Sequence, residues 1–470
     1  MGGVATAQEQ GQGQSILDRD YRVLTAGVIL SITAVAFEGL AVTTIAPAIA
    51  GELRGLGLYG WIFSAYMLAQ IVGTVIAGQV VDRRGPALPA TAAMLLFGAG
   101  LALAALAPTM PLLVASRALQ GLGAGALANC VYASINLRYD DQLRPSMLAV
   151  VSSAYIVPSM IGPFLAGLIA ERFGWRAVFW ILLPILIISA ALTLPTFRRS
   201  GATAAPAARN QIPTALQLAI GTGLLLAGLG RLPGLLGLLI AVIGLGCTLP
   251  ALRRLLPAGT LLARHGLPAA ILTRGLFVAA YFSADTYLVL TLTDLRGYSP
   301  SIAGLAIATG SLAWTACAWI QARLDRRDNG EGRARRIQLG VAALLLGALG
   351  MALVPWWGAG ALALALTAHL LAGMGIGLAH PTVGAFAFAR AKEGESGAIS
   401  AALLLADSFT PAVAIGLGGA LIAAGQIVGW SPQFTIGGAL GFSAPLLALG
   451  LFAASRLREA KVGKGGEPMG

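Results

Sequence analysis

The stretch Gly78-Gln79-Val80-Val81-Asp82-Arg83-Arg84-Gly85 places a carboxylate and two guanidinium groups between two apolar segments, near residues 58–81 and 88–107. Each segment is long enough for a membrane-spanning helix, which needs about 20 apolar residues. We expect Gly78–Gly85 to form a short charged loop that acts as an ionic latch between moving helices. In such a latch Asp82, with Arg83 beside it, meets a neighbouring helix N-terminus or an arginine. The alternative is a solvated loop that carries positive charge on the cytoplasmic side.

The composition is that of a polytopic membrane protein. The chain has 470 residues, of which 57% are hydrophobic and 11% charged. Soluble domains carry about a quarter charged residues. The net charge of +12 could indicate nucleic-acid binding in a soluble protein, but these basic residues lie in short loops between apolar runs. The three cysteines lie in apolar runs at unrelated spacings, which predicts packing roles and no metal site.

Fourteen apolar segments can cross a membrane. They lie near residues 23–50, 58–81, 88–107, 110–137, 145–170, 176–196, 213–230, 232–252, 268–293, 299–322, 337–355, 359–388, 397–425 and 434–455. Twelve spans would remain if residues 213–252 were peripheral, but runs this apolar are more easily placed in lipid. We therefore predict an all-α polytopic chain. Its parts are a disordered tail 1–17, a six-helix bundle 18–197, a linker 198–267 with two extra helices, a second bundle 268–457, and a cytoplasmic tail 458–470.

The basic residues predict the orientation in the membrane. With the N-terminus inside, the inner segments hold 24 of the lysines and arginines, and the outer loops hold five. Cytoplasmic loops are enriched in these residues, so we expect both termini to lie in the cytoplasm. The expected location of the chain is the inner (cytoplasmic) membrane. Residues 1–17 lack a small-residue cleavage site, so the first span is expected to serve as an uncleaved anchor.

A repeat relates the two halves. Arg117 begins a stretch with glycines at 121, 123 and 125, and His369 begins a matching stretch with glycines at 373, 375 and 377. Glu38 in the first span has a counterpart in Asp285 in the ninth, and the intervals to Arg117 and His369 are 79 and 84 residues. Halves built alike, with polar residues at corresponding depths, are typical of a transporter whose halves rock about a central site. The glycines also let helices pack closely.

These motifs resemble those of the major facilitator superfamily. The pattern Gly-x-x-x-Asp-Arg-x-Gly at residues 78–85 is similar to the signature loop of that superfamily, and Arg117-Ala-Leu-Gln120-Gly121-Leu-Gly123 is similar to its element in span four. Gly162-Pro163-Phe-Leu-Ala-Gly167 resembles the span-five motif associated with antiporters, although Ala166 replaces a glycine. The resemblance implies two pseudo-symmetric six-helix bundles.

Other segments resemble the fourteen-span drug:proton antiporters more closely. Glu38-Gly-Leu-Ala-Val-Thr43-Thr-Ile-Ala-Pro47 is similar to the span-one element of that family, with glutamate in place of aspartate and Thr43 in place of asparagine. Residues 175–184 and 296–304 also resemble it, although Leu182 replaces an asparagine. The first loop reads Gly85-Pro86-Ala87-Leu88 where a further basic residue is common, which weakens the expected latch.

Charged residues within spans are the candidate proton-coupling sites. A charge at the bilayer centre costs about 2.5–3.5 kcal/mol, so Glu38, Asp285, Asp407 and Arg117 are expected to face away from lipid. Glu38 is the first choice for proton coupling, and the alternative is a permanent structural pair with Arg117. Asp285 is expected to be a second proton site, a cation contact or a member of a pair in the second half. Asp407 is expected to carry a proton or to line the cavity where Pro411 loosens the helix.

Further polar and aromatic side chains could line a substrate cavity. These are Tyr66, Gln70, Asn129, Tyr155, Tyr281, Phe282, Tyr287, His369 and His380. For each histidine, a hydrogen-bonded packing role is the alternative.

The function expected from these features is proton-coupled export of lipophilic or amphipathic compounds. Lipids or lipid-like molecules are a rival cargo, and a solute importer would show more polar lining. An intramembrane enzyme and a channel are disfavoured, since the hydrolase motifs are missing and the halves repeat. No Gly-x-x-x-x-Gly-Lys-Ser/Thr stretch occurs, so ATP is not the expected energy source. We expect no cofactor, a monomer, and protons, cargo and the lipid bilayer as partners.

Overall fold

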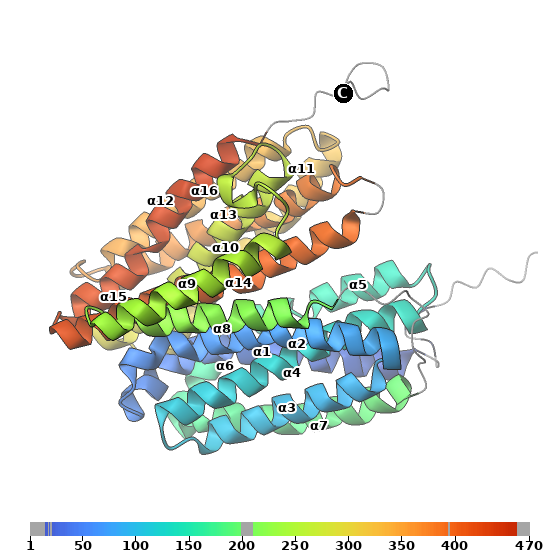
Figure 1. The fold of residues 1–470 in the computed structure, drawn as a ribbon, viewed down its shortest axis with the longest axis horizontal. Helices are drawn as coiled ribbons and strands as arrows, with labels where there is room; N and C mark the ends of the chain where they lie inside the picture. Colours follow the sequence, from blue (N-terminus) through green and yellow to red (C-terminus); the bar gives the residue numbers. More distant parts are fainter. Residues whose placement is uncertain (1–14, 17, 19–20, 199–209, 393–394, 458–470) are drawn as a thin grey trace, which may run out of the picture.

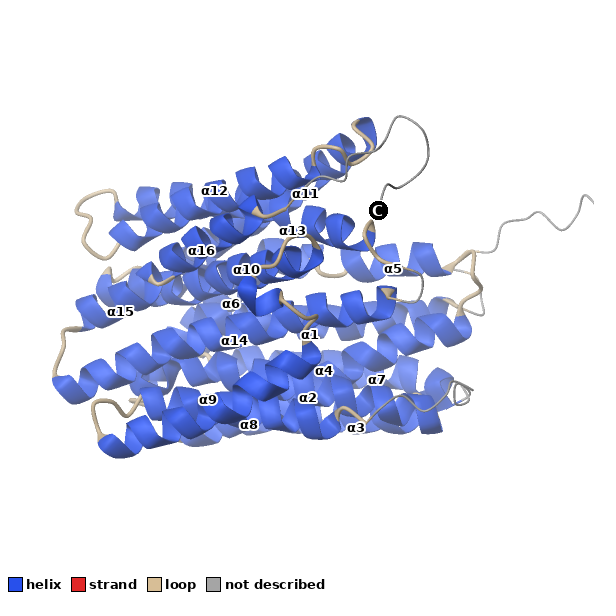
Figure 2. Ribbon diagram, turned by 45° about the horizontal axis from the view of Figure 1, so that its top comes forward, coloured by secondary structure: helices blue, strands red, loops and turns tan. Residues whose placement is uncertain are grey.

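The fold is built from helices alone in every part of the chain that the structure describes. This computed structural model describes residues 15–16, 18, 21–198, 210–392 and 395–457, and Figure 2 shows these ranges as helices joined by short loops. Backbone polar groups cannot remain unpaired in lipid, and a helix satisfies them within one segment. The predicted all-helical polytopic class is therefore confirmed. The predicted tail 458–470 and most of the tail 1–17 lie outside the described residues.

The first half contains seven helices. They are α1 (Arg22–Glu52), α2 (Tyr59–Arg84), α3 (Ala87–Leu106), α4 (Met110–Arg138), α5 (Arg144–Ser153), α6 (Ile156–Phe173) and α7 (Arg176–Arg198), with a short helix η1 (Leu56–Leu58) before α2. The fifth predicted span is divided into α5 and α6. Pro158 has no N–H to bond the Ala154 carbonyl, and the Thr33 hydroxyl donates to that carbonyl at 3.4 Å instead.

The linker and the second half follow. The linker helices are α8 (Ile212–Leu229) and α9 (Leu235–Leu255), followed by η2 (Thr260–Leu262). The second half consists of α10 (Leu267–Leu290), η3 (Thr291–Leu295), α11 (Pro300–Arg327), α12 (Arg333–Leu353), α13 (Ala361–Phe388), α14 (Ser396–Val428), α15 (Pro432–Gly441) and α16 (Ser443–Ser455). A serine followed by proline starts α11 and α15, and in each case the serine hydroxyl accepts a hydrogen bond from a first-turn N–H.

The helices give fourteen membrane spans when α5–α6 and α15–α16 are each taken as one span. By length and composition, thirteen spans among the described residues can cross a membrane, and α4 is the remaining one. It is 29 residues long and carries buried polar side chains, among them Arg117 and Gln120, which make it less apolar. It packs against α2 and α3, so these side chains face protein and not lipid.

Two bundles face each other across a seam. Figure 1 shows α1–α7 on one side and α10–α16 on the other, with α8 and α9 lying along the seam between them. The linker helix α8 packs against α2 of the first bundle and α14 of the second. Consecutive spans alternate in direction, so the start of α1 at Arg22 and the end of α16 at Ser455 lie at one end of the molecule. We call this the proximal end, and the end where α1 finishes at Glu52 the distal end.

The bundles are tied together toward the distal end. Hydrogen bonds join them at three places among the described residues. The Tyr59 hydroxyl donates to the Thr286 carbonyl (3.0 Å), the Ser64 hydroxyl to the Ala412 carbonyl (2.7 Å), and the Ser301 N–H to the Glu171 carboxylate (2.7 Å). Tyr59 and Ser64 lie in the first turns of α2, and Ser301 lies in the first turn of α11, which places all three bonds in the distal half of the molecule.

The prediction that Gly78–Gly85 form a loop is wrong, because most of these residues are helical. The α2 helix continues through Asp82 and Arg83 to Arg84, and only Gly85 and Pro86 connect it to α3. Gly85 ends the helix with φ 75°, a conformation that glycine adopts without steric cost, and its N–H bonds the Val81 carbonyl at 2.8 Å. Aspartate and arginine are tolerated in the last turn of a helix. The charged residues therefore indicate where the membrane ends, and they do not indicate where the helix ends.

Candidate functional site

The centre of the first bundle holds a buried ion pair. The Arg117 guanidinium of α4 contacts the Glu38 carboxylate of α1, and these side chains are 2% and 0% exposed. The same guanidinium donates to the Ile62 carbonyl at 3.0 Å and to the Gln120 side chain, and it lies over the Tyr66 ring, 4.4 Å from the ring centroid. The structure thus brings together the four residues Glu38, Arg117, Gln120 and Tyr66 that the sequence singled out separately.

Glu38 depends on Arg117 for its charge partner. It lies 16 residues after the start of α1, about 24 Å along the helix axis at 1.5 Å per residue and so deep within the span. Neither carboxylate oxygen accepts a conventional hydrogen bond from another described residue. A buried carboxylate is costly unless it is paired or protonated. Separation from Arg117 would therefore require Glu38 to gain a proton or water.

Close helix packing holds this pair in place. A Cβ atom on Gly121 would lie 2.1 Å from the Tyr66 carbonyl oxygen of α2, and one on Gly123 would lie 2.5 Å from the Phe97 nitrogen of α3. The Gln120 side chain also donates to the Gly100 carbonyl of α3 at 2.9 Å. The predicted packing role of this motif agrees with these contacts, which seat α4 tightly between two helices.

The motif Gly162–Gly167 lies where the two bundles meet. The carbonyl oxygen of Pro163 in α6 would lie 2.4 Å from a Cβ on Gly304 in α11. A Cβ on Gly167 would lie 2.6 Å from the backbone of Ser301, also in α11, whereas Gly162 faces Phe37 within its own bundle. Small residues here let α6 and α11 approach closely near the distal end.

The second bundle holds a pair at the corresponding position. His369 Nε2 of α13 lies 3.3 Å from Asp285 Oδ1 of α10, and both side chains are buried. The Tyr281 ring stacks on His369 with 5.6 Å between ring centroids. The Asp285 Oδ1 atom and the Tyr281 hydroxyl accept or donate no hydrogen bond among the described residues. The sequence repeat, which relates Glu38 to Asp285 and Arg117 to His369, therefore corresponds to two equivalent contacts. In the first the basic partner, Arg117, is always a cation. In the second the basic partner, His369, is a cation only when it is protonated.

A third charged group lies in the second bundle, and sequence reasoning missed one of its members. Arg274 of α10 donates to both Asp407 oxygens of α14, at 2.8 and 2.6 Å. It also donates to the His380 carbonyl at 3.2 Å, and His380 Nε2 lies 3.6 Å from Asp407 Oδ1. The Arg274, Asp407 and His380 side chains are 10%, 25% and 26% exposed. Arg274 was not among the predicted site residues, although an arginine within a span was itself the signal.

Aromatic rings connect the two charged groups of the second bundle. Trp314 of α11 lies 5.4 Å from Tyr281, 6.3 Å from Phe282 and 5.5 Å from His380, centroid to centroid. Trp314 was not among the predicted lining residues. Trp314 is half-buried, and with a tyrosine, a phenylalanine and a histidine it forms a cluster of rings of the kind that contacts flat or cationic molecules.

The remaining predicted lining residues divide into two groups. Tyr155 is 46% exposed, and Gln70 and Asn129 are half-buried, so all three retain accessible surface. Tyr287 instead is fully buried, and its hydroxyl donates to the Ile415 carbonyl of α14. Its ring packs against Tyr59 at 5.9 Å, which places Tyr287 in the distal contact between the bundles.

The predicted latch is not engaged in this structure. Asp82 and Arg83 lie in the last turn of α2, and neither side chain forms an ion pair or hydrogen bond with another described residue. Arg83 is exposed, and Asp82 is half-buried. The role of this turn therefore remains a prediction.

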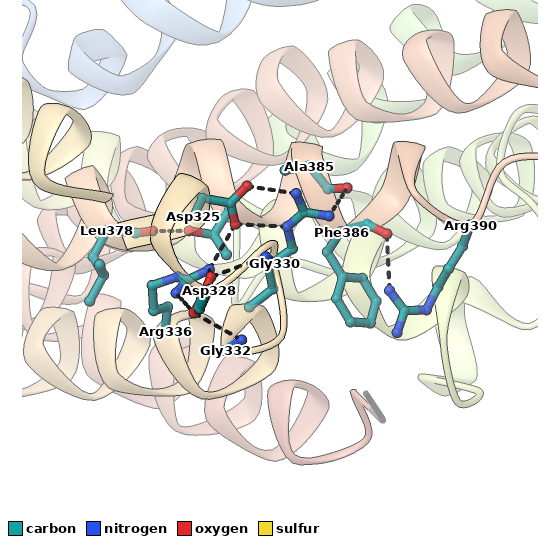
Figure 3. Close-up of polar contacts among 11 residues, drawn as sticks. Asp325, Asp328, Gly330, Gly332, Arg336, Leu378, Ala385, Phe386 and Arg390 are labelled. Atoms are coloured by element: carbon teal, nitrogen blue, oxygen red, sulfur yellow. Dashed lines mark hydrogen bonds and ion pairs between the residues drawn. The ribbon is translucent and has the colours of Figure 1, made fainter. Parts of the chain in front are cut away.

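The acidic side chains of the equivalent turn in the second bundle are paired. Asp325 of α11 accepts hydrogen bonds from Arg333 at 2.8 and 2.6 Å and from Arg336 at 2.7 Å. Asp328 accepts two from Arg336, at 2.5 and 3.4 Å (Figure 3). Arg333 also donates to the Ala385 carbonyl of α13 at 3.3 Å. The hydrogen bond from Arg336 holds the pKa of Asp328 below its ordinary value. The signal in the sequence was the repeat of Asp82-Arg83-Arg84 as Asp325-Arg326-Arg327.

Comparison with known proteins agrees with this geometry. Residues 27–414 match the family model of the Major Facilitator Superfamily. The chain is 28% identical over 441 residues to a probable multidrug-efflux transporter of Mycobacterium tuberculosis, an alignment that covers 89% of this chain and 91% of that protein. It is 32% identical to the multidrug transporter protein MdtP of Bacillus subtilis and 31% identical to the multidrug efflux pump SdrM of Staphylococcus aureus. These two alignments span 36% and 37% of this chain, and 31% and 39% of the relatives.

Solved structures share the fold. A D-xylose–proton symporter superposes with a TM-score of 0.65 at 12% identity, covering 94% of this chain and 99% of the other. A peptide transporter of the POT family gives a TM-score of 0.65 at 15% identity, covering 92% and 98%. At these identities the likeness describes the arrangement of helices.

Proposed function

Because this chain belongs to the Major Facilitator Superfamily, and is thus a transporter and not an enzyme, we propose that it is a proton-coupled exporter of lipophilic or amphipathic compounds. The observation that carries the proposal is the buried Glu38–Arg117 pair, a titratable group within a span whose charge has a single described partner. The relatives named as multidrug transporters support the choice of cargo.

The orientation follows from the basic residues. Cytoplasmic loops carry the excess of lysine and arginine, so we assign the proximal end to the cytoplasm. The hydrogen bonds between the bundles lie toward the distal end, at Tyr59, Ser64 and Ser301. This pattern fits a conformation closed to the outside, from which cargo would enter the seam from the cytoplasm or the inner leaflet.

The pair supplies a way to couple proton movement to rocking of the bundles. With the Arg117 guanidinium beside it, the Glu38 carboxylate is stabilised in its charged form. If α4 shifts relative to α1, the carboxyl group loses that partner, and its buried position then favours the protonated form. Glu38 would load a proton in one conformation and release it in the other. Rocking thus becomes dependent on the proton.

Asp285 and His369 would form a second proton site. They occupy the position equivalent to Glu38 and Arg117, and a histidine partner, unlike an arginine, has a neutral and a protonated form. Two equivalent sites, one in each bundle, would let two protons move in a cycle.

The cargo would bind on the second bundle between the aromatic rings and the partly exposed Asp407. Asp407 lies next to His380, and the His380 ring lies beside Trp314, which in turn contacts Phe282; such a cluster suits a flat molecule, including a cationic one. Lipid-like cargo is the second candidate, favoured by the apolar lining and by the access from the inner leaflet that this conformation would give. A solute importer is the less favoured alternative. The superposition on the xylose–proton symporter reflects the fold alone.

Transport in proteoliposomes tests the proposal. Purified protein should move a lipophilic cation uphill when an imposed pH gradient is present and should stop when an ionophore collapses that gradient. A panel of lipophilic cations and fluorescent lipids would separate the two cargo classes. Uphill transport that persists without the proton gradient, or that requires ATP, would refute proton coupling.

A further inference from the structure

A small apolar cavity lies where the linker meets the second bundle. Its lining comes from the last turn of α9, the short helix η2, the first part of α10 and the middle of α14, and it includes Leu252, Leu256, Ile271, Leu405 and Phe409. The cavity therefore lies apart from the Glu38–Arg117 and Asp285–His369 pairs, which lie on α1, α4, α10 and α13.

The cavity offers nothing to a polar ligand. Of the described residues that line it, only Thr260 and Thr410 carry polar side-chain atoms. The Thr260 hydroxyl donates to the Pro257 carbonyl at 2.7 Å, and the Thr410 hydroxyl donates to the Gly275 carbonyl at 2.6 Å. Because both donors are already used, the space suits a hydrocarbon chain.

Exposed arginines stand next to the cavity. Arg253 and Arg254 lie between the lining residues Leu252 and Leu256, in the same last turn of α9. Both are exposed, and neither forms an ion pair with another described residue. Residues 249–273 also include Arg264 and contain no aspartate or glutamate. The two arginines therefore face no competing carboxylate from their own segment.

The connecting segment is held in a fixed position. The Arg456 guanidinium after α16 donates to the Leu262 carbonyl at 3.3 Å and to the Ala263 carbonyl at 3.2 Å. The cavity wall formed by η2 is thus anchored to the end of the second bundle, and the arginines of α9 keep their place beside it.

From this arrangement we propose that the cavity, of about 60 Å³, takes up a short segment of one acyl chain of an anionic phospholipid, whose phosphate is held by Arg253 and Arg254. An apolar cavity and two unpaired cations in the same helical turn match the two parts of such a lipid, and the proximal leaflet supplies it. The bound lipid would attach the linker helix α9 to α10 and α14.

Native mass spectrometry of the purified full-length chain tests this site. The protein would be mixed in detergent with equal amounts of phosphatidylglycerol and phosphatidylcholine of the same acyl chains. We expect the unmodified protein to retain one phosphatidylglycerol molecule in preference. In R253Q/R254Q we expect the affinity for that lipid to fall about tenfold, the effect of losing charge-assisted contacts to the phosphate.

Two further variants distinguish a specific lipid site from non-specific electrostatic attraction of anionic lipid to arginines. R326Q/R327Q removes two exposed arginines from the last turn of α11 and should leave lipid retention unchanged. Leu256→Trp fills the cavity while both arginines remain, and it should also release the lipid. Equal loss in R326Q/R327Q would overturn the proposal, as would retention in Leu256→Trp or in R253Q/R254Q. Unchanged thermal unfolding of each variant confirms that it is folded.

Discussion

Replacement of Arg117 by methionine removes the only cation that contacts the Glu38 carboxylate among the described residues, and it leaves that carboxylate buried. Breaking a buried ion pair by removing one partner destabilises a protein by about 3–5 kcal/mol. Glu38 is 0% exposed and accepts no conventional hydrogen bond that could compensate. We therefore expect a loss of about 4 kcal/mol in the free energy of unfolding.

The double variant E38Q/R117M should recover most of that loss. It has no buried unpaired charge, so the remaining cost is the lost hydrogen bond to the Ile62 carbonyl and the lost contact with the Tyr66 ring, about 1–2 kcal/mol together. The double variant should therefore be about 2–3 kcal/mol more stable than R117M.

Equilibrium unfolding in mixed micelles, followed by circular dichroism, measures these differences. The control is Arg176→Met, which breaks the pair with Glu52, where the two side chains are 36% and 53% exposed. An exposed pair contributes at most about 1 kcal/mol. If E38Q/R117M unfolds as easily as R117M, Glu38 is not the source of the instability and the reasoning fails.

Three further predictions concern packing, pH and topology. Gly121→Ala should abolish folding or transport, because its Cβ would lie 2.1 Å from a backbone oxygen. The control is Gly39→Ala on α1, whose Cβ would meet nothing within 4 Å and which should be tolerated. Equal transport by both variants would contradict the packing. Because the pKa of Asp328 is lowered in the folded protein, its hydrogen bonds stabilise the α11–α12 turn above the ordinary aspartate pKa of about 3.9 and are lost as the pH falls through its lower folded value. Protection of the Gly330 and Gly332 amides, which donate to Asp328, should then decrease in acid relative to the same amides in Asp328→Asn, and protection independent of pH would contradict this. In a background without other accessible cysteines, Arg84→Cys should react with an impermeant thiol reagent from the cytoplasmic side alone and Arg54→Cys from the outside alone; the reverse labelling would invert the orientation.

The repeat in the sequence predicted the central geometry well. Glycines at every second position after Arg117 and after His369 require close helix neighbours, and the matched intervals place Glu38 and Asp285 at corresponding positions on their helices. Both pairs form as contacts in the structure. Spacing along two helices determines which residues share a depth, and that information is present in the sequence.

Other features depended on contacts that spacing does not encode. Arg274 and Asp407 are 133 residues apart and meet only because α10 packs against α14. The turn at Asp82 was predicted as a loop because its charges mark the membrane boundary, whereas the helix ends at Gly85, where the backbone conformation changes. Tyr287 resembled a lining residue because it is polar and aromatic, but its hydroxyl is used in the contact with α14.

The most direct test of the account is proton-coupled transport by Glu38→Gln in proteoliposomes. The substitution keeps the size of the side chain and its capacity for hydrogen bonds, and removes its titration. The matched control is Glu52→Gln, which changes a carboxylate at the distal end of the same helix. We expect Glu38→Gln to fold and bind cargo but to lose uphill transport driven by a pH gradient, while Glu38→Asp keeps partial activity and Glu52→Gln keeps full activity. Uphill transport by Glu38→Gln at the rate of the unmodified protein would contradict the account and would assign the proton to Asp285 or Asp407.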